Sequence, residues 1–253
     1  MGQTGLQWNY SKQAKYYKYR PNYSPKAIDF LVWWVSEKGK KKDLQVADIG
    51  AGTGNLTLLL LERGLFVYAI EPNDAMMEIG MERTKNYSNV KWIKATATET
   101  TLPSESCDWV AFGSSFNVCD RDKAILEVYR ILKNNGYMTC MWNHRDLDDP
   151  IQKKAEEIIL KYVPNYERGV RREDQRPFFK KYQHLFDELF YIEVDFYVER
   201  TVDEYIKAWK SVRNKYWEPD GEIFSKLEEE WRKNLPSKFT IKYTSRAWTV
   251  KKK

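Results

Sequence analysis

The sequence is poor in the residues that build disulfide frameworks and metal centres. It has three cysteines (Cys107, Cys119 and Cys140) and two histidines (His144 and His184) in 253 residues. Cysteines so few and so scattered complete neither a disulfide framework nor the ligand spacing of a zinc site. We therefore expect reduced thiols and no metal, so the chemistry of the protein must rest on other residues.

Long apolar runs are also missing. No uninterrupted apolar stretch approaches the roughly 18 residues that a membrane span requires, and Met1 to Thr4 carry no apolar signal core. We find no internal repeat and no low-complexity linker. Hydrophobic residues make up 42% of the chain and charged residues 31%, which is a globular balance. These features predict a soluble, cytoplasmic protein without membrane association.

The excess of positive charge is small. Lys and Arg number 42 against 36 Asp and Glu, a net charge of +6, and much of the surplus lies at 38–42 and 251–253. Solvated lysines explain such runs, so we expect no nucleic-acid partner. Aromatic residues, by contrast, reach 15%, with 10 Trp and 17 Tyr. A core of this size does not absorb all of them, so some must line a surface or cleft.

One stretch, Val46 to Glu71, is typical of a nucleotide-binding unit. It predicts a strand, a turn with glycines at 50, 52 and 54, an apolar helix, and a second strand that ends in Glu71. The glycines permit positive φ and let a ligand approach the backbone, and the helix N-terminus offers unpaired N–H groups. Glu71 stands where ribose hydroxyls need an acceptor. We therefore predict a mononucleotide-like cofactor.

Strands and helices alternate through this half of the chain. The patterns predict strands at 45–49, 66–70, 90–94, 108–112 and 137–142, helices at 54–63, 73–84 and 120–132, and a turn at Asn134-Asn135-Gly136. This alternation indicates parallel βαβ units, in which ligands bind beyond the carboxyl ends of the strands. The loops after the five strands should therefore converge on one site.

Further elements flank this region. A tyrosine-rich segment precedes a helix that begins at Pro25 with Ser24 as its N-cap; the segment either packs against the main domain or forms a lid over the cofactor. After Pro150 we expect helices at 151–163, around Tyr182 to Leu189, at 202–214 and at 221–234, and alternating strands at 190–199 and from Phe239 to about Val250. Thr201 and Glu204 have the spacing of a capping box.

Three features disfavour a dinucleotide cofactor. The glycine spacing is not Gly-x-Gly-x-x-Gly, so the pyrophosphate fingerprint is incomplete. The carboxylate of Asp48, before the turn, suits a cationic amine more than a pyrophosphate. The two final strands look antiparallel, which a dinucleotide fold does not need.

With these residues the sequence resembles the class I S-adenosylmethionine-dependent methyltransferases, and among them the type 11 small-molecule group that includes trans-aconitate methyltransferase-like enzymes. The segments that carry the resemblance are Asp48 to Gly54, Glu71-Pro72-Asn73, Leu102-Pro103, Asp108-Trp109-Val110, Ala124 to Leu132 with Asn135-Gly136, Trp142 to Asp146, Tyr19 to Tyr23, and Thr201 to Tyr205. The resemblance implies an α/β fold, a doubly wound, mostly parallel seven-stranded sheet with a helical cap. We divide the chain into an N-terminal lid and first helix (1–40), a cofactor-binding core (41–150), and the remaining strands with the cap over the acceptor site (151–253).

The resemblance also implies S-adenosylmethionine as the cofactor. The glycine turn would wrap its methionine part with Asp48 near the amino group, Glu71 would accept from both ribose hydroxyls, and the lid residues Tyr16 and Arg20 would meet the carboxylate. The implied cofactor residues are Tyr16, Arg20, Asp48, Gly50, Ala51, Gly52, Thr53, Gly54, Asn55, Glu71, Pro72, Asn73, Met76, Thr96, Ala97, Thr98, Ser114 and Ser115. Thr96 stands where many relatives have an acidic residue, so adenine recognition must rely on backbone.

The acceptor is less well defined, because Phe116-Asn117-Val118-Cys119 replaces the Phe-His-Trp-Phe of the subgroup. Candidate acceptor residues are Phe116, Asn117, Arg145 and Trp217. An arginine clamp for an acidic acceptor (Arg145, Arg171, Arg172 and Arg176) competes with a solvated basic loop.

Methyl transfer from a sulfonium needs alignment above all, and a base only when the acceptor must lose a proton. His144, expected in the loop after the fifth strand, is the candidate base, whereas His184 is expected to be structural. We expect transfer to an oxygen or nitrogen of a small metabolite by a monomer or homodimer. A nucleic-acid methyltransferase and a catalytically silent cofactor-binding protein are the alternatives.

Overall fold

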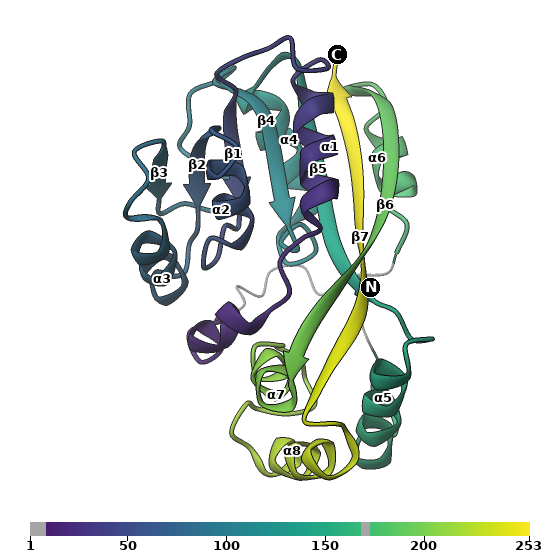
Figure 1. Cartoon of the computed structure of the whole chain (residues 1–253). Helices are drawn as coiled ribbons and strands as arrows, with labels where there is room; N and C mark the ends of the chain where they lie inside the picture. Colours follow the sequence, from purple (N-terminus) through teal and green to yellow (C-terminus); the bar gives the residue numbers. More distant parts are fainter. Residues whose placement is uncertain (1–8, 168–172) are drawn as a thin grey trace.

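The computed structural model describes residues 9–167 and 173–253 and places seven strands in one twisted sheet (Figure 1). The strand order is β3-β2-β1-β4-β5-β7-β6. The five parallel strands are β1 (Gln45–Ile49), β2 (Phe66–Ile70), β3 (Val90–Ile93), β4 (Cys107–Gly113) and β5 (Leu132–Arg145). β7 (Lys238–Lys252) runs antiparallel to both β5 and β6 (Phe186–Thr201). The predicted doubly wound, mostly parallel sheet is confirmed.

Helices cover both faces of the parallel strands. α1 (Pro25–Val35) and α2 (Asn55–Leu61) pack on the face that carries Val46 and Val67. α4 (Arg121–Ile131) packs on the other face, against Val110 and its neighbours. Because successive residues of a strand point to opposite faces, strands covered on both sides read as continuous apolar runs, which is the pattern that the sequence shows at 108–112.

The last two strands extend beyond the parallel sheet and carry a second lobe (Figure 1). This lobe contains α5 (Pro150–Tyr162), α7 (Val202–Lys210) and α8 (Glu222–Asn234). Its own core is strongly aromatic and includes Tyr205, Trp209, Trp217, Phe224 and Trp231. Three of the ten tryptophans therefore lie in the core of this helical cap. The predicted Thr201–Glu204 capping box starts α7.

Two local predictions were wrong, and a third, Ser24 as the N-cap of α1, is confirmed in position. The short helix expected around Tyr182 to Leu189 lies earlier, as α6 (Arg176–Lys181), because Pro177 favours the first helical turn; Phe186 already begins β6. The turn at Asn134-Asn135-Gly136 is a bulge inside β5: Cys107 pairs with Leu132 but Trp109 pairs with Tyr137. Ser24 precedes α1, but its side chain makes no capping bond. The structure adds a 3-10 helix, η1 (Ala14–Tyr19), within the tyrosine-rich segment.

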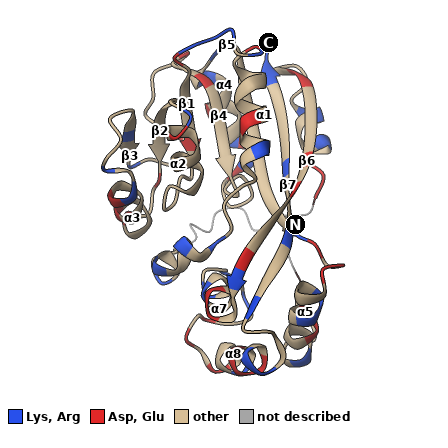
Figure 2. Cartoon of the chain, in the orientation of Figure 1, with Lys and Arg blue, Asp and Glu red and all other residues tan. Residues whose placement is uncertain are grey.

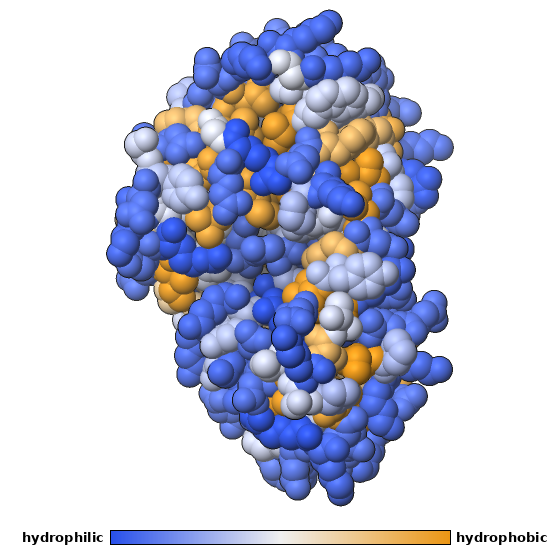
Figure 3. Space-filling view, in the orientation of Figure 1, coloured by the Kyte–Doolittle hydropathy of each residue, from blue (hydrophilic) through white to orange (hydrophobic). Residues whose placement is uncertain are grey.

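The face of the protein seen in Figures 2 and 3 is mostly hydrophilic and carries charged residues of both signs. Lys and Arg mingle with Asp and Glu on both lobes (Figure 2), and hydrophilic side chains cover most of the face seen in Figure 3. None of the helices in the described part of the chain combines the length and the apolarity that crossing a membrane would need.

Candidate functional site

The glycine turn follows β1 at the carboxyl edge of the parallel strands. Gly50, Gly52 and Gly54 have φ values of 71°, 59° and 79°, the left-handed region that a Cβ makes costly. A Cβ on Gly50 would lie 2.5 Å from the Cβ of Ser115, so the turn has no room for a side chain there. The N–H groups of Gly50 and Ala51 donate to the carbonyl of Ile70 at 2.8 and 3.0 Å, which fixes the turn against the end of β2.

Glu71 follows β2 beside this turn and is held by two backbone N–H groups. Its Oε2 accepts from the N–H of Gly52 at 2.8 Å, and its Oε1 accepts from the N–H of Asn73 at 2.9 Å. The residue is 7% exposed, and this burial raises the pKa of its carboxyl group, although the two N–H groups oppose the shift. The carboxylate is therefore oriented by the backbone at the place predicted for a ribose acceptor.

Asp48, in β1, is 1% exposed and has one carboxylate oxygen without a partner. Oδ2 accepts from the hydroxyl of Thr57 at 2.7 Å, whereas Oδ1 is buried and has no hydrogen-bond partner within residues 9–167 and 173–253. Burial raises the pKa of Asp48 to about 7. Since a buried, unbonded carboxylate oxygen is costly, a cationic amine of a ligand would supply what is missing. The residues thus fit the amino-acid half of S-adenosylmethionine.

The start of α3 (Asp74–Thr84) completes the ribose side of the site. Asn73 caps this helix by accepting from the N–H of Met76 at 3.1 Å. Met76 is buried, and its Cε lies 3.1 Å from where a Cβ on Gly52 would stand. Pro72 is exposed. Gly52, Glu71, Asn73 and Met76 are thus brought together as the sequence predicts.

The adenine-edge residues follow the end of β3. The N–H of Glu71 donates to the carbonyl of Ile93 at 3.1 Å, so the ends of β2 and β3 are level. Beyond this point the hydroxyls of Thr96 and Thr98 lie 3.2 Å apart, and Ala97 is partly buried against the core. Their role in adenine binding stays a prediction.

Serines after β4 close the other side of the turn. Ser115 donates from Oγ to the carbonyl of Ile49, and the hydroxyl of Ser114, whose φ is 60°, is hydrogen-bonded to that of Tyr23 at 2.9 Å. Phe116 has no exposed surface, because its ring packs 4.9 Å from that of Phe112 in the core. A wall of an acceptor pocket would need an exposed face, so the contacts of Phe116 do not support that role.

The side chain of Asn117 is also engaged: its Oδ1 accepts from the indole N–H of Trp142 at 2.9 Å. Any contact between this amide oxygen and an acceptor would have to share or replace that bond.

The predicted lid residues point to the cap lobe. Arg20 donates from Nε to the hydroxyl of Ser211 at 2.9 Å and from Nη2 to its carbonyl at 3.1 Å. Tyr16 donates to Asp220 at 3.4 Å. The same segment reaches the cofactor edge, where Asn73 donates to the hydroxyl of Ser11 at 3.2 Å. Residues 9–20 therefore bridge the two lobes, and a direct contact of Tyr16 or Arg20 with the cofactor stays a prediction.

His144 lies in a strand instead of the predicted loop. β5 continues to Arg145 because β7 pairs with it along this length, His144 opposite Thr244 and Arg145 opposite Tyr243. The imidazole is largely buried, with 8% of the residue exposed. His184, expected in a helix, lies in the turn after α6.

Each of the two predicted acceptor arginines that the structure describes already pairs with a carboxylate. Arg145 pairs with Glu156 at 3.3 Å, and its guanidinium carbon lies 4.3 Å from the centre of the Trp209 ring. Arg176 pairs with Asp174 at 2.6 Å. Arg171 and Arg172 lie outside the described residues. Trp217 stacks on Tyr166 in the core of the cap, with ring centres 5.5 Å apart.

Sequence reasoning missed Arg83. Its Nη1 donates to the carbonyl and the hydroxyl of Thr53 and, at 2.6 Å, to Oδ1 of Asn55. The signal that could have found it is helical spacing, since Met76, Gly80 and Arg83 recur at intervals of four and three residues in α3 and share one face.

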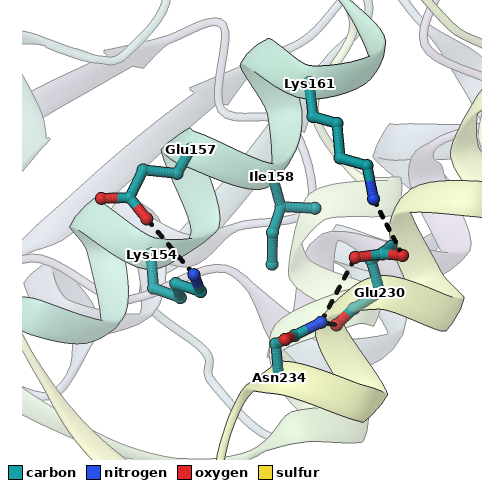
Figure 4. Close-up of a pocket in the computed structure, with 6 residues that line it drawn as sticks. All are labelled: Lys154, Glu157, Ile158, Lys161, Glu230 and Asn234. Atoms are coloured by element: carbon teal, nitrogen blue, oxygen red, sulfur yellow. Dashed lines mark hydrogen bonds and ion pairs between the residues drawn. The ribbon is translucent and has the colours of Figure 1, made fainter.

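A surface groove of about 210 Å³ lies elsewhere, between α5 and α8 (Figure 4). The charged side chains that line it form ion pairs with one another: Lys154 pairs with Glu157 at 3.4 Å and Lys161 with Glu230 at 3.2 Å. We assign it no role. In the chain as described, no three His, Cys, Asp or Glu residues are grouped so that they could hold a metal ion.

Comparison with known proteins agrees with this geometry. Residues 47–140 match a family described as "Methyltransferase domain". An uncharacterised methyltransferase of Mycobacterium tuberculosis is 37% identical over 136 residues, which cover 54% of this chain and 52% of that protein. The ubiquinone/menaquinone biosynthesis C-methyltransferase UbiE of Proteus mirabilis is 30% identical over 139 residues, covering 51% of this chain and 55% of that protein. The chain spans about half the length of these curated relatives.

The fold also matches solved structures. The YcgJ protein of Bacillus subtilis superposes with a TM-score of 0.56 at 16% identity, covering 88% of this chain and 97% of that one. At such identity the likeness concerns the fold alone, and the fold is the one predicted from the alternation of strands and helices.

Proposed function

We infer that this chain, whose residues 47–140 match a methyltransferase domain, transfers a methyl group from S-adenosylmethionine to an oxygen or nitrogen of a small molecule. The observation that carries the proposal is the pairing of Glu71 with the glycine turn. A carboxylate fixed by the N–H groups of Gly52 and Asn73 lies beside a turn that has no room for a side chain at Gly50.

Each half of the cofactor has residues suited to hold it. Glu71 would accept from the ribose hydroxyls. The unbonded Oδ1 of Asp48 would accept from the amino group, and the first N–H groups of α2 would face the carboxylate. S-adenosylmethionine, when bound, supplies an electrophilic methyl group on a sulfonium. The contribution of the protein is alignment, which can lower a barrier by roughly 7–11 kcal/mol when donor and acceptor are held at near-attack distance.

The acceptor atom is open to a direct test, because the name of UbiE describes transfer to carbon. The protein would be incubated with methyl-labelled S-adenosylmethionine and fractionated small metabolites, and the position of the label in the product would be read by NMR. Label on an oxygen or nitrogen is the expected result. Label on carbon would correct the acceptor class, and the absence of any label in small molecules would contradict the proposal.

A nucleic-acid acceptor is less favoured. Binding to a phosphate backbone calls for a clustered basic surface, whereas ion pairs occupy basic residues on both lobes, among them Lys94 with Asp74 at 2.7 Å and, in the cap, Lys161 with Glu230 at 3.2 Å. Salt-dependent RNA binding together with label in RNA would revive this alternative.

A further inference from the structure

Arg83 contacts the C-terminal end of the glycine turn, beyond the residue that Glu71 holds. One of its nitrogens, Nη1, donates hydrogen bonds to the carbonyl and the hydroxyl of Thr53 and to the side-chain oxygen of Asn55. These residues flank Gly54, the N-cap of α2. Glu71 accepts from the N–H of Gly52. The turn is therefore fixed at two points along the chain, by a carboxylate at Gly52 and by a guanidinium at Thr53 and Asn55.

The packing of α3 explains how Arg83 reaches the turn. Gly80 has no side chain, so the helix can lie on the indole of Trp92, which stands 2.1 Å from where a Cβ on Gly80 would be. Trp92 in turn donates to the hydroxyl of Thr84 at 2.9 Å. The Cα of Gly80 lies only 3.7 Å from where a Cβ on Gly54 would stand. The helix and the turn are thus in direct contact.

The charge of Arg83 is not neutralised by a partner. Within the described residues no carboxylate lies within ion-pair distance of this guanidinium, and its burial lowers its pKa. Charged donors make stronger hydrogen bonds than neutral ones. Because the side-chain hydrogen bonds of Arg83 go to Thr53 and Asn55, we expect this guanidinium to hold the turn in place.

We propose that Arg83 is a positioning residue that sets the affinity of the protein for the methionine half of the cofactor, a role that rests on the proposed function. It holds the Thr53 carbonyl and the Asn55 side chain, so the C-terminal end of the glycine turn keeps one conformation. Binding of the adenosine half, which is assigned to Glu71 and the residues after it, does not depend on these bonds of Arg83.

Two ligands and a matched arginine separate this role from general stability. S-adenosylhomocysteine contains both halves of the cofactor, whereas 5′-methylthioadenosine lacks the amino-acid part. Arg63 is the control: it makes comparable bonds at the far end of α2, to Asp29 at 2.7 Å and to the carbonyls of Leu59 at 2.7 Å and Pro25 at 3.2 Å. Calorimetric titration of both ligands would be run on the wild type, Arg83→Met, Arg83→Lys and Arg63→Met, with Tm as a check of folding.

We expect Arg83→Met to weaken S-adenosylhomocysteine about tenfold, which is about 1.4 kcal/mol, and 5′-methylthioadenosine less than twofold. Arg83→Lys should recover part of the loss, and Arg63→Met should change neither affinity. Unchanged binding of S-adenosylhomocysteine by Arg83→Met, or equal weakening of both ligands, would overturn the role of Arg83. A wild-type protein that binds neither ligand would instead refute the proposed function itself.

Discussion

Replacing Glu71 by glutamine tests the ribose site with the smallest change of shape. The carboxylate accepts the N–H of Gly52 at 2.8 Å and that of Asn73 at 2.9 Å. Glutamine offers one oxygen and one NH2 group, so one of these N–H groups must face another donor. A buried donor left without an acceptor costs about 1–3 kcal/mol. We expect Glu71→Gln to lower the free energy of unfolding by about that amount.

Glu71→Gln should also lower the affinity of the protein for S-adenosylhomocysteine. The carboxylate can accept from both ribose hydroxyls, and a hydrogen bond to a charged group contributes about 1.5–3 kcal/mol. Losing one such bond and weakening the other predicts about a hundredfold drop in affinity for S-adenosylhomocysteine, near 2.7 kcal/mol. Isothermal titration calorimetry would measure it, with Glu82→Gln as the control, since Glu82 is 70% exposed and pairs only with Lys85. Affinity within threefold of the wild type in a folded Glu71→Gln protein would refute this assignment.

Three further substitutions test other parts of the account. Gly50→Ala should destabilise the protein by more than Gly39→Ala does, because both have positive φ but only the first would meet Ser115; chemical denaturation compares them. The pKa of Asp48, about 7, predicts that affinity for S-adenosylhomocysteine rises roughly fivefold between pH 6 and 7 as the carboxylate ionises, and is flat in Asp48→Asn. The same shift makes the stability contributed by this group fall as pH rises from 3.8, the ordinary pKa of the side chain, towards 7, since the unfolded state loses its proton first; equal pH profiles of wild type and Asp48→Asn would contradict both statements. Thr201→Ala should cost about 1 kcal/mol of stability by removing the cap of α7, and a changed cofactor affinity in that variant would be unexpected.

The cofactor site was predictable because its signals are local. Three glycines with positive φ and a carboxylate at the end of the next strand lie within about one βαβ unit, so their spacing alone fixes their relation. Buried parallel strands can also be predicted from the sequence, because both of their faces need apolar residues. Hence β1 and β2 have the predicted bounds.

The acceptor side was not predictable, because it depends on residues far apart in the chain. His144 belongs to a strand only because β7, a hundred residues later, pairs with β5 at that point. Arg145 looked free for a ligand, but Glu156 from the next helix already pairs with it. The contacts of Arg83 with Thr53 and Asn55 span about 30 positions, so the helical spacing of Arg83 indicates the face it shares but not its partners. Such tertiary contacts outweigh the local pattern.

The central claim is that the glycine turn and Glu71 bind S-adenosylmethionine, and a crystal structure of the protein soaked with S-adenosylhomocysteine tests it most directly. The account predicts density for the ligand with both ribose hydroxyls on Glu71 and the amino group at Asp48. Density elsewhere, an empty turn at saturating ligand, or a nicotinamide dinucleotide in its place from a parallel soak would contradict it.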